Sequence, residues 1–164
     1  MEKVTAPVRV GDKMPDFSLP MHPQGEFELA RELGNRHIVL YFYPMDDTPG
    51  CTREACSFRD SQAEFEKHGA LILGVSKDSL KSHEKFAAKY RLPFPLLTDS
   101  GNNLRKRLGN PGGGQFISRI TYVVDKQGTV RQIINADGKA KVPDHISEAL
   151  RVVHELAGGE ATAV

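Results

Sequence analysis

The stretch Ile38–Asp60, IVLYFYPMDDTPGCTREACSFRD, decides the fold. It opens with Ile38–Tyr43, an apolar run rich in the β-branched and aromatic residues that are typical of a buried strand. The prolines, aspartates and glycine of Pro44–Gly50 then indicate a tight turn. After Cys51, apolar residues recur near the helical period, which predicts a helix that extends to about His68. The order of strand, tight loop and helix therefore places Cys51 in or near the first helical turn.

Cys51 is a candidate nucleophile because of this position. The N–H groups of a first helical turn have no partner within the helix, and the helix dipole is positive at that end. Both effects favour the thiolate, which is the reactive form of cysteine, over the thiol. The alternative is a small buried apolar residue, the commonest role of a free cysteine. The Pro-Gly turn directly before Cys51 and its charged or polar neighbours favour the nucleophile.

The same segment resembles the active-site pattern of the peroxiredoxins, P-x-x-x-T/S-x-x-C, in which Pro44, Thr48 and Cys51 take the defined positions. The longer stretch is similar to the bacterioferritin-comigratory or Q-type subfamily, whose second cysteine lies five residues after the first. In this chain that residue is Cys56, and an arginine before a later strand, Arg119, adds to the resemblance. The similarity covers most of the chain, from GDKMPDFSLP at residues 11–20 to TYVVDKQG at residues 121–128.

The resemblance implies a role for each of these residues. Cys51 would attack one peroxide oxygen as the peroxidatic cysteine and become a sulfenic acid. Cys56 would then resolve the sulfenic acid by forming an intramolecular disulfide. The hydroxyl of Thr48 would bond both the thiolate and the peroxide, and Pro44 would limit the access of water. The fixed charge of Arg119 would stabilise the thiolate and the negative charge that develops on the leaving oxygen.

Each supporting role has a plainer alternative. Thr48 could be an ordinary turn residue, Arg119 a solvated side chain, and Cys56 a residue of the helix core. Glu54, one helical turn after Cys51, could orient the arginine or could be an exposed carboxylate of the first turns. The residues alone leave these alternatives open, and the resemblance favours the functional ones.

Length and composition restrict the class of protein. A chain of 164 residues with 39% hydrophobic and 26% charged residues is expected to form a single globular domain over residues 1–164, with a frayed tail from about residue 158. A net charge of +1 gives no footprint for nucleic acid, and no apolar run approaches the length of a membrane span. The first residues lack the apolar region of a secretory signal, so a cytoplasmic location is expected. Two cysteines do not make a disulfide scaffold, and His68 and His83 lack zinc-finger spacing, so we expect neither a metal nor an organic cofactor.

The chain as a whole alternates strand and helix patterns, which predicts an α/β fold with a mixed central sheet and helices on both faces. Through the resemblance, this is a thioredoxin-like fold with added N-terminal strands. Gly69 is expected to end the helix after Cys51, and Ser79 or Ser82 to cap the next helix. Residues 109–114, GNPGGG, are expected to form a mobile surface loop. The other expected strands are Val8–Val10, 17–19, 27–29, Leu71–Val75, Leu96–Thr98, Ile120–Asp125 and Thr129–Ile134, and the other expected helices are 102–108 and Pro143–Leu156.

We therefore expect a thiol-dependent peroxidase of the atypical two-cysteine kind, which acts on hydrogen peroxide or organic hydroperoxides in antioxidant defence. A dithiol protein such as thioredoxin would reduce the Cys51–Cys56 disulfide, and the chain would be a monomer or weak dimer without a nucleic-acid or membrane partner. One alternative is a protein thiol–disulfide oxidoreductase, although the usual C-x-x-C motif is absent. Another alternative is a redox-sensing or metal-binding module.

Overall fold

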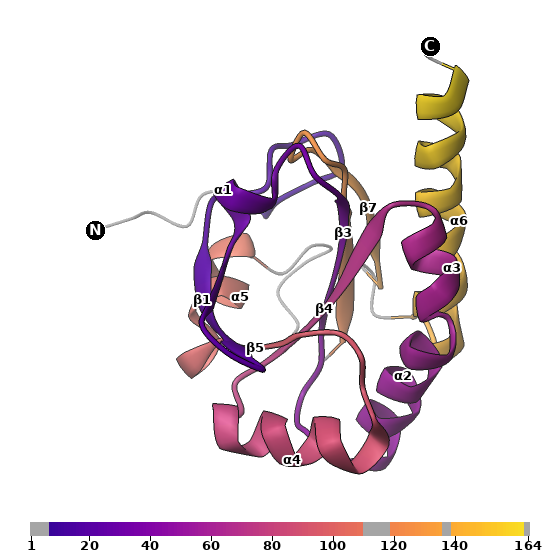
Figure 1. Ribbon diagram of the computed structural model, residues 1–164. Coiled ribbons are helices and arrows are strands. Elements are labelled where there is room, and N and C mark those ends of the chain that lie inside the picture. The colour runs from indigo at the N-terminus through magenta and orange to yellow at the C-terminus, as the bar shows by residue number, and fades with distance from the viewer. Residues whose placement is uncertain (1–6, 110–118, 136–138, 163–164) are drawn as a thin grey trace.

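A mixed sheet forms the centre of the protein. The computed structural model describes residues 7–109, 119–135 and 139–162, and within these ranges seven strands pair in the order β2-β1-β5-β4-β3-β6-β7 (Figure 1). The central strand β3 is parallel to β4 and antiparallel to β6. The strands are β1 (Ser18–His22), β2 (Glu26–Glu28), β3 (His37–Phe42), β4 (Ala70–Ser76), β5 (Leu96–Thr98), β6 (Ile120–Val124) and β7 (Val130–Ile134).

Helices cover both faces of this sheet, as the sequence predicts. In Figure 1, α2, α3 and α6 stand side by side on one side of the sheet, whereas α1 and α5 lie on the other. The described helices are α1 (Leu29–Glu32), α2 (Pro49–Asp60), α3 (Gln62–Lys67), α4 (Leu80–Tyr90), α5 (Asn103–Leu108) and α6 (Val142–Thr162), with a 3₁₀ turn, η1, at Ser100–Asn102. None of these helices is both long and apolar enough to cross a membrane.

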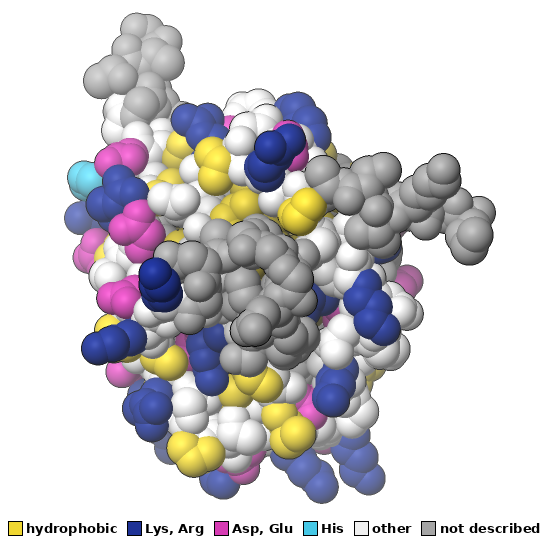
Figure 2. All heavy atoms as spheres, turned by 180° about the vertical axis from the view of Figure 1, so that it is seen from behind, with side chains coloured by type: hydrophobic (Ala, Val, Ile, Leu, Met, Phe, Trp, Pro, Cys, Tyr) yellow, Lys and Arg dark blue, Asp and Glu magenta, His cyan; other side chains and the backbone are white. Residues whose placement is uncertain are grey.

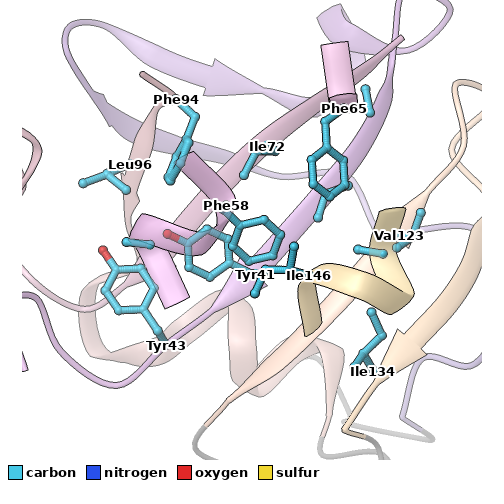
Figure 3. Packing of buried hydrophobic residues seen from close by; sticks show 14 of the residues in the cluster. Tyr41, Tyr43, Phe58, Phe65, Ile72, Phe94, Leu96, Val123, Ile134 and Ile146 are labelled. Carbon is cyan, nitrogen blue, oxygen red and sulfur yellow. The ribbon is translucent and has the colours of Figure 1, made fainter. Parts of the chain in front are cut away.

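The strand β3 separates two apolar clusters because its side chains alternate between the faces of the sheet. Ile38, Leu40 and Phe42 belong to one cluster. Tyr41 belongs to the other, where its ring stacks on that of Phe58 from α2 with 4.5 Å between the ring centroids (Figure 3). Since every residue of β3 is buried, the apolar run of the sequence becomes the core of the sheet. The Tyr41–Phe58 contact packs the last turn of α2 against the strand.

Several expected boundaries are confirmed. The chain after α3 turns at Gly69, which has a φ of +74° in the left-handed region that favours glycine. The hydroxyl of Ser79 accepts a hydrogen bond from the backbone N–H of Ser82 at 3.1 Å, so Ser79 is the residue that caps α4. The expected strands Ile120–Asp125 and Thr129–Ile134 form β6 and β7, which pair antiparallel. Beyond Gly109, the expected loop at residues 109–114 lies outside the described residues.

Three expected boundaries differ from the structure. The helix after Cys51 is interrupted at Ser61, whose N–H is shared between the carbonyls of Ser57 (3.2 Å) and Phe58 (3.1 Å). Because the apolar pattern continues across this break, the period alone does not reveal it. The last helix also continues past Leu156 to Thr162.

The third difference is at the N-terminus, where Val8–Val10 is not a strand. The N–H of Val8 bonds the carbonyl of Leu108 at the end of α5, where no neighbouring strand is available. Further on, the segment runs along the outer edge of β7: the N–H of Gly11 bonds the carbonyl of Val130, and the N–H of Val130 bonds the carbonyl of Asp12, both at 2.8 Å. This segment therefore adds an irregular cover to one edge of the sheet.

The charged surface is mixed. Figure 2 shows Lys and Arg side chains scattered over one face of the molecule among acidic, apolar and uncharged ones. The charge of the whole chain is nearly balanced, with 22 basic and 21 acidic residues.

Candidate active site

The first turn of α2 presents Cys51 at the end of β3. Thr48 has extended backbone angles (φ −95°, ψ 158°) and is the N-cap of α2, and Pro49 occupies the first helical position. Proline suits that position because its fixed φ matches the helix and its missing N–H would have no helical partner. Cys51 follows as the third helical residue, and only 1% of its surface is exposed. The predicted strand–loop–helix arrangement is confirmed.

Arg119 reaches the sulfur from the neighbouring strand. The register of β3 and β6 pairs Phe42 with Ile120, so Arg119, just before β6, lies level with the loop that follows β3. Its Nη1 donates to Sγ of Cys51 at 3.5 Å and to Oε1 of Glu54 at 2.8 Å. The side chain of Asn135 donates to the Arg119 carbonyl at 2.6 Å, which fixes the backbone at this point. The solvated alternative for Arg119 is therefore wrong.

Gly50 makes this close approach possible. A Cβ atom at position 50 would lie 2.9 Å from Nη2 of Arg119, closer than a carbon can normally approach. The sequence pattern indicated Gly50 only as part of a turn. The absence of a side chain at Gly50 also leaves space for the guanidinium of Arg119, which is distant in the sequence. The local sequence does not indicate this second role.

Glu54 is the carboxylate that anchors Arg119. Its side chain is fully buried, so the alternative of an exposed first-turn carboxylate is wrong. Burial raises the pKa of Glu54 to about 7, although the charge and the hydrogen bond of Arg119 act in the opposite direction. The guanidinium is therefore shared between a sulfur atom and a carboxyl group that changes its charge near neutral pH.

Behind Glu54 lies a histidine that the sequence did not indicate. Nδ1 of His145, on α6, is 2.7 Å from Oγ1 of Thr121 on β6 and 3.8 Å from Oε2 of Glu54. All three side chains are buried. Burial, with a smaller effect of the Arg119 charge, lowers the pKa of His145 to about 4, so this histidine is neutral at physiological pH.

The other predicted site residues lie on α2 or in the loop before it, and none of these described residues forms a hydrogen bond with the sulfur of Cys51. The hydroxyl of Thr48 donates to the carbonyl of Met45 at 3.2 Å and not to the sulfur. Pro44 is half-buried where β3 leads into the loop, and Cys56 is half-buried on α2. Both cysteines are free thiols in this structure. In the described ranges, no group of three or more His, Cys, Asp and Glu side chains is arranged to hold a metal ion.

The loop before α2 is held by buried hydrogen bonds between Asp46 and its partners, which include His83. Oδ1 of Asp46 accepts from the hydroxyl of Tyr43 at 2.6 Å, and Oδ2 accepts from the hydroxyl of Ser82 at 2.8 Å. Nδ1 of His83 is 2.8 Å from the same Oδ2, and its Nε2 is 3.0 Å from the carbonyl of Leu97. Both ring nitrogens of His83 therefore have a partner in the buried interior. These bonds connect the active-site loop with α4 and β5.

The fold and the site together define the class of thioredoxin-fold peroxiredoxins: a buried cysteine in the first turn of a helix on a mixed sheet, with an arginine at its sulfur. The chain belongs to the AhpC/TSA family, whose model matches residues 10–133. It is 43% identical to the chloroplastic peroxiredoxin Q of Triticum aestivum over 155 residues. This match covers 93% of this chain and 70% of that protein. It is 41% identical over 150 residues to a putative peroxiredoxin, bcp, of Coxiella burnetii, which covers 87% of this chain and 97% of that protein.

Solved structures agree with this assignment. The crystal structure of peroxidoxin BcpB from Mycobacterium tuberculosis superposes with a TM-score of 0.79 at 32% identity, covering 89% of this chain and 96% of that one. A mutant of peroxiredoxin Q from Xylella fastidiosa superposes with a TM-score of 0.80 at 30% identity, covering 93% of this chain and 99% of that one. The predicted thioredoxin-like fold is therefore confirmed, and membership of the family supports a thiol-dependent peroxidase.

Proposed function

We propose that the protein reduces hydrogen peroxide and organic hydroperoxides through Cys51, in antioxidant defence. The observation that carries this proposal is the 3.5 Å contact between Nη1 of Arg119 and Sγ of Cys51 in the first turn of α2. A fixed cation at the sulfur favours the thiolate, and it also stabilises the negative charge that the leaving oxygen acquires.

The reaction would proceed in three balanced steps. The thiolate of Cys51 attacks the terminal oxygen of ROOH, the O–O bond breaks, and Cys51 becomes a sulfenic acid while RO⁻ takes a proton to leave as ROH. The thiol of Cys56 then displaces the hydroxyl of the sulfenic acid, which forms a disulfide and releases water. A dithiol protein such as thioredoxin finally reduces the disulfide and is itself oxidised. A cytoplasmic location and a monomeric or weakly dimeric state belong to the same proposal.

Stopped-flow mixing of the reduced protein with hydrogen peroxide tests this function. We expect rapid oxidation of the wild-type chain, with a disulfide as the product, and no oxidation of the Cys51→Ser variant at this site. The Cys56→Ser variant should consume one equivalent of peroxide and stop at the sulfenic acid, which a dimedone adduct would identify. A wild-type Cys51 that reacts no faster than free cysteine would refute the proposal. Reduction of protein disulfides in the absence of peroxide would favour the oxidoreductase alternative.

A further inference from the structure

A row of buried polar side chains extends from the sulfur into the protein. After Arg119 and Glu54, the row continues to His145 of α6 and then to Thr121 of β6, so three secondary-structure elements contribute to it. The side chains of Glu54 and His145 are completely excluded from solvent. Polar groups in such a place are costly unless they bond one another, so their arrangement restricts the protons that they carry.

The two unmatched atoms of this row indicate which nitrogen of His145 carries the proton. Oε2 of Glu54 and Nε2 of His145 have no hydrogen-bond partner among the described residues. If Nδ1 carries the proton, it donates to Thr121 and its N–H also faces Oε2 of Glu54 at 3.8 Å, while the lone pair of Nε2 and Oε2 itself have no hydrogen bond. If Nε2 carries the proton, both its buried N–H and Oε2 of Glu54 are unmet. The first arrangement leaves no buried N–H donor unpaired, and it turns an N–H instead of a lone pair towards the carboxylate of Glu54.

We propose that His145 is a positioning residue for peroxide reduction: its Nδ1–H, fixed by Thr121, favours the ionised form of Glu54 and so keeps Arg119 on the sulfur of Cys51. This inference rests on the function proposed above. The present 3.8 Å between Nδ1 and Oε2 is longer than a hydrogen bond. A shift of about 1 Å would bring the two atoms to the usual N–H···O length.

The charge of Glu54 determines how firmly Arg119 is held. An ionised Glu54 gives Arg119 a charge-assisted hydrogen bond, which is roughly twice as strong as a neutral one. Because the pKa of Glu54 is about 7, the rate of Cys51 oxidation should include a component that rises with pH through this value. The titratable groups around Glu54 come from every element packed on it: Cys51 of α2, Tyr41 of β3, Arg119 before β6, and His145 of α6 with its neighbour Asp144.

The test compares three replacements of His145 in the full chain. His145→Asn keeps a donor at the Nδ1 position, whereas His145→Leu removes it. His145→Gln places its amide near the Nε2 position, so it is a second variant without a donor at the Nδ1 position, and it keeps the test valid if the leucine variant does not fold. His154→Asn is the matched control, because His154 is an exposed histidine on the same helix. Glu54→Gln identifies the component of the pH profile that belongs to Glu54.

The measurement is the stopped-flow rate constant of Cys51 oxidation by hydrogen peroxide as a function of pH. The midpoint of the Glu54 component should move upward by about one pH unit in His145→Leu and His145→Gln, which lowers this component of the rate roughly fivefold at pH 7. At alkaline pH these variants should approach the wild-type rate. His145→Asn and His154→Asn should keep the wild-type midpoint, and Glu54→Gln should lose the component.

The outcomes separate this inference from the function on which it rests. If wild-type Cys51 is not oxidised rapidly, the proposed function itself fails. If the wild type is oxidised but has no component that Glu54→Gln removes, the positioning role of His145 is wrong. An unchanged midpoint in folded His145→Leu or His145→Gln, or an equal loss of rate at every pH, would also overturn it, because a merely structural role lowers the rate without moving the midpoint.

Discussion

At the sulfur of Cys51, burial and charge act in opposite directions. Burial disfavours the thiolate, because an ion loses the solvation of water. The guanidinium of Arg119 and the unbonded N–H groups at the start of α2 favour it. Glu54 fixes the guanidinium, but when it is ionised its negative charge also offsets part of the effect of the guanidinium on the sulfur. Reactivity of Cys51 therefore depends on how Arg119 is divided between the sulfur and the carboxylate.

We predict that Arg119 affects the oxidation step and not the reduction by dithiol. Arg119→Ala should lower the rate constant of Cys51 oxidation by roughly 10²–10³-fold, the range found when one donor to a developing oxyanion is removed. Arg119→Lys should be intermediate, because it keeps a charge but loses the planar fork that reaches two partners. Stopped-flow oxidation and steady-state turnover, measured on the same variants, give the two steps separately.

The matched control for this prediction is Arg36→Ala. Arg36 is an exposed arginine that is also bonded to a glutamate, Glu32, four residues earlier in the chain. This variant should be oxidised at the wild-type rate. Wild-type oxidation of Arg119→Ala would show that the contact at the sulfur has no catalytic effect.

The sequence predicted part of this site at the level of single residues. Cys51 and Arg119 were predicted to meet, and Glu54 was named as a residue that could orient the arginine. His145 was not predicted, because its closeness to Glu54 comes from the packing of α6 on α2 and has no counterpart in local spacing. The role of the Thr48 hydroxyl stays a prediction, since in this structure it bonds the carbonyl of Met45.

At the level of elements, α2 keeps the two cysteines apart. Both belong to one uninterrupted helix, and residues five apart on a helix have Cα atoms about 8.6 Å apart. A disulfide rarely spans more than about 7 Å between Cα atoms. Cys51 and Cys56 therefore cannot join until the first turns of α2 unwind.

We predict that oxidation melts the first part of α2. Amide hydrogen exchange over residues 52–59 should be slow in the reduced protein and faster in the disulfide form, because local opening of a helix end requires little free energy. Exchange measured by mass spectrometry in both redox states tests this. In α3, which is separated from α2 by the break at Ser61, protection should be unchanged. Equal protection of α2 in the two states, with a confirmed Cys51–Cys56 bond, would exclude unwinding.

A second prediction at this level concerns the loop between β3 and α2. Asp46→Asn should destabilise the protein by about 1–3 kcal/mol, because the amide turns an NH2 group towards one set of partners of Asp46 and leaves a buried hydrogen bond unmade. Urea unfolding at neutral pH gives the change. Asp47→Asn is the control, since Asp47 binds Lys89 and Tyr90 at the surface and should contribute little. Equal stability of Asp46→Asn and the wild type would mean that the buried hydrogen bonds of Asp46 contribute nothing to stability.

At the level of the whole molecule, the expected architecture is confirmed where apolar patterns are long. The runs that became β3 and β4 are buried on both faces of the sheet, so their composition alone indicates strands. Val8–Val10 has two β-branched valines but no adjacent strand, and its backbone bonds the end of α5. A strand needs a partner, and a local sequence does not contain that information.

The stability of the fold should depend on pH through two opposed groups. The pKa of Glu54 is raised from 4.5 to about 7, so its contribution to stability is present below pH 4.5 and is lost as pH rises to about 7. The pKa of His145 is lowered from 6.5 to about 4, so its contribution is present above pH 6.5 and is lost as pH falls to about 4. Each shift corresponds to about 3 kcal/mol, and in the wild type the two trends largely cancel.

Replacing one of these groups should reveal the other. We predict that the free energy of unfolding of Glu54→Gln increases as pH rises from about 4 to 6.5, and that of His145→Asn decreases from about 4.5 to 7. Urea titrations across this range measure both slopes, with His154→Asn as the control that follows the wild type. Parallel pH profiles for all four proteins would contradict the opposed titration.

The irregular segment along β7 also affects how copies of the protein can meet. An open sheet edge presents unpaired N–H and C=O groups on which another chain can template a further strand. Gly11 and Asp12 already bond Val130 at the start of β7, so an incoming strand would have to displace them. This short stretch is not itself a strand, but it occupies the edge of β7. It thus hinders the addition of a strand from another copy of the protein, and so hinders aggregation through that edge.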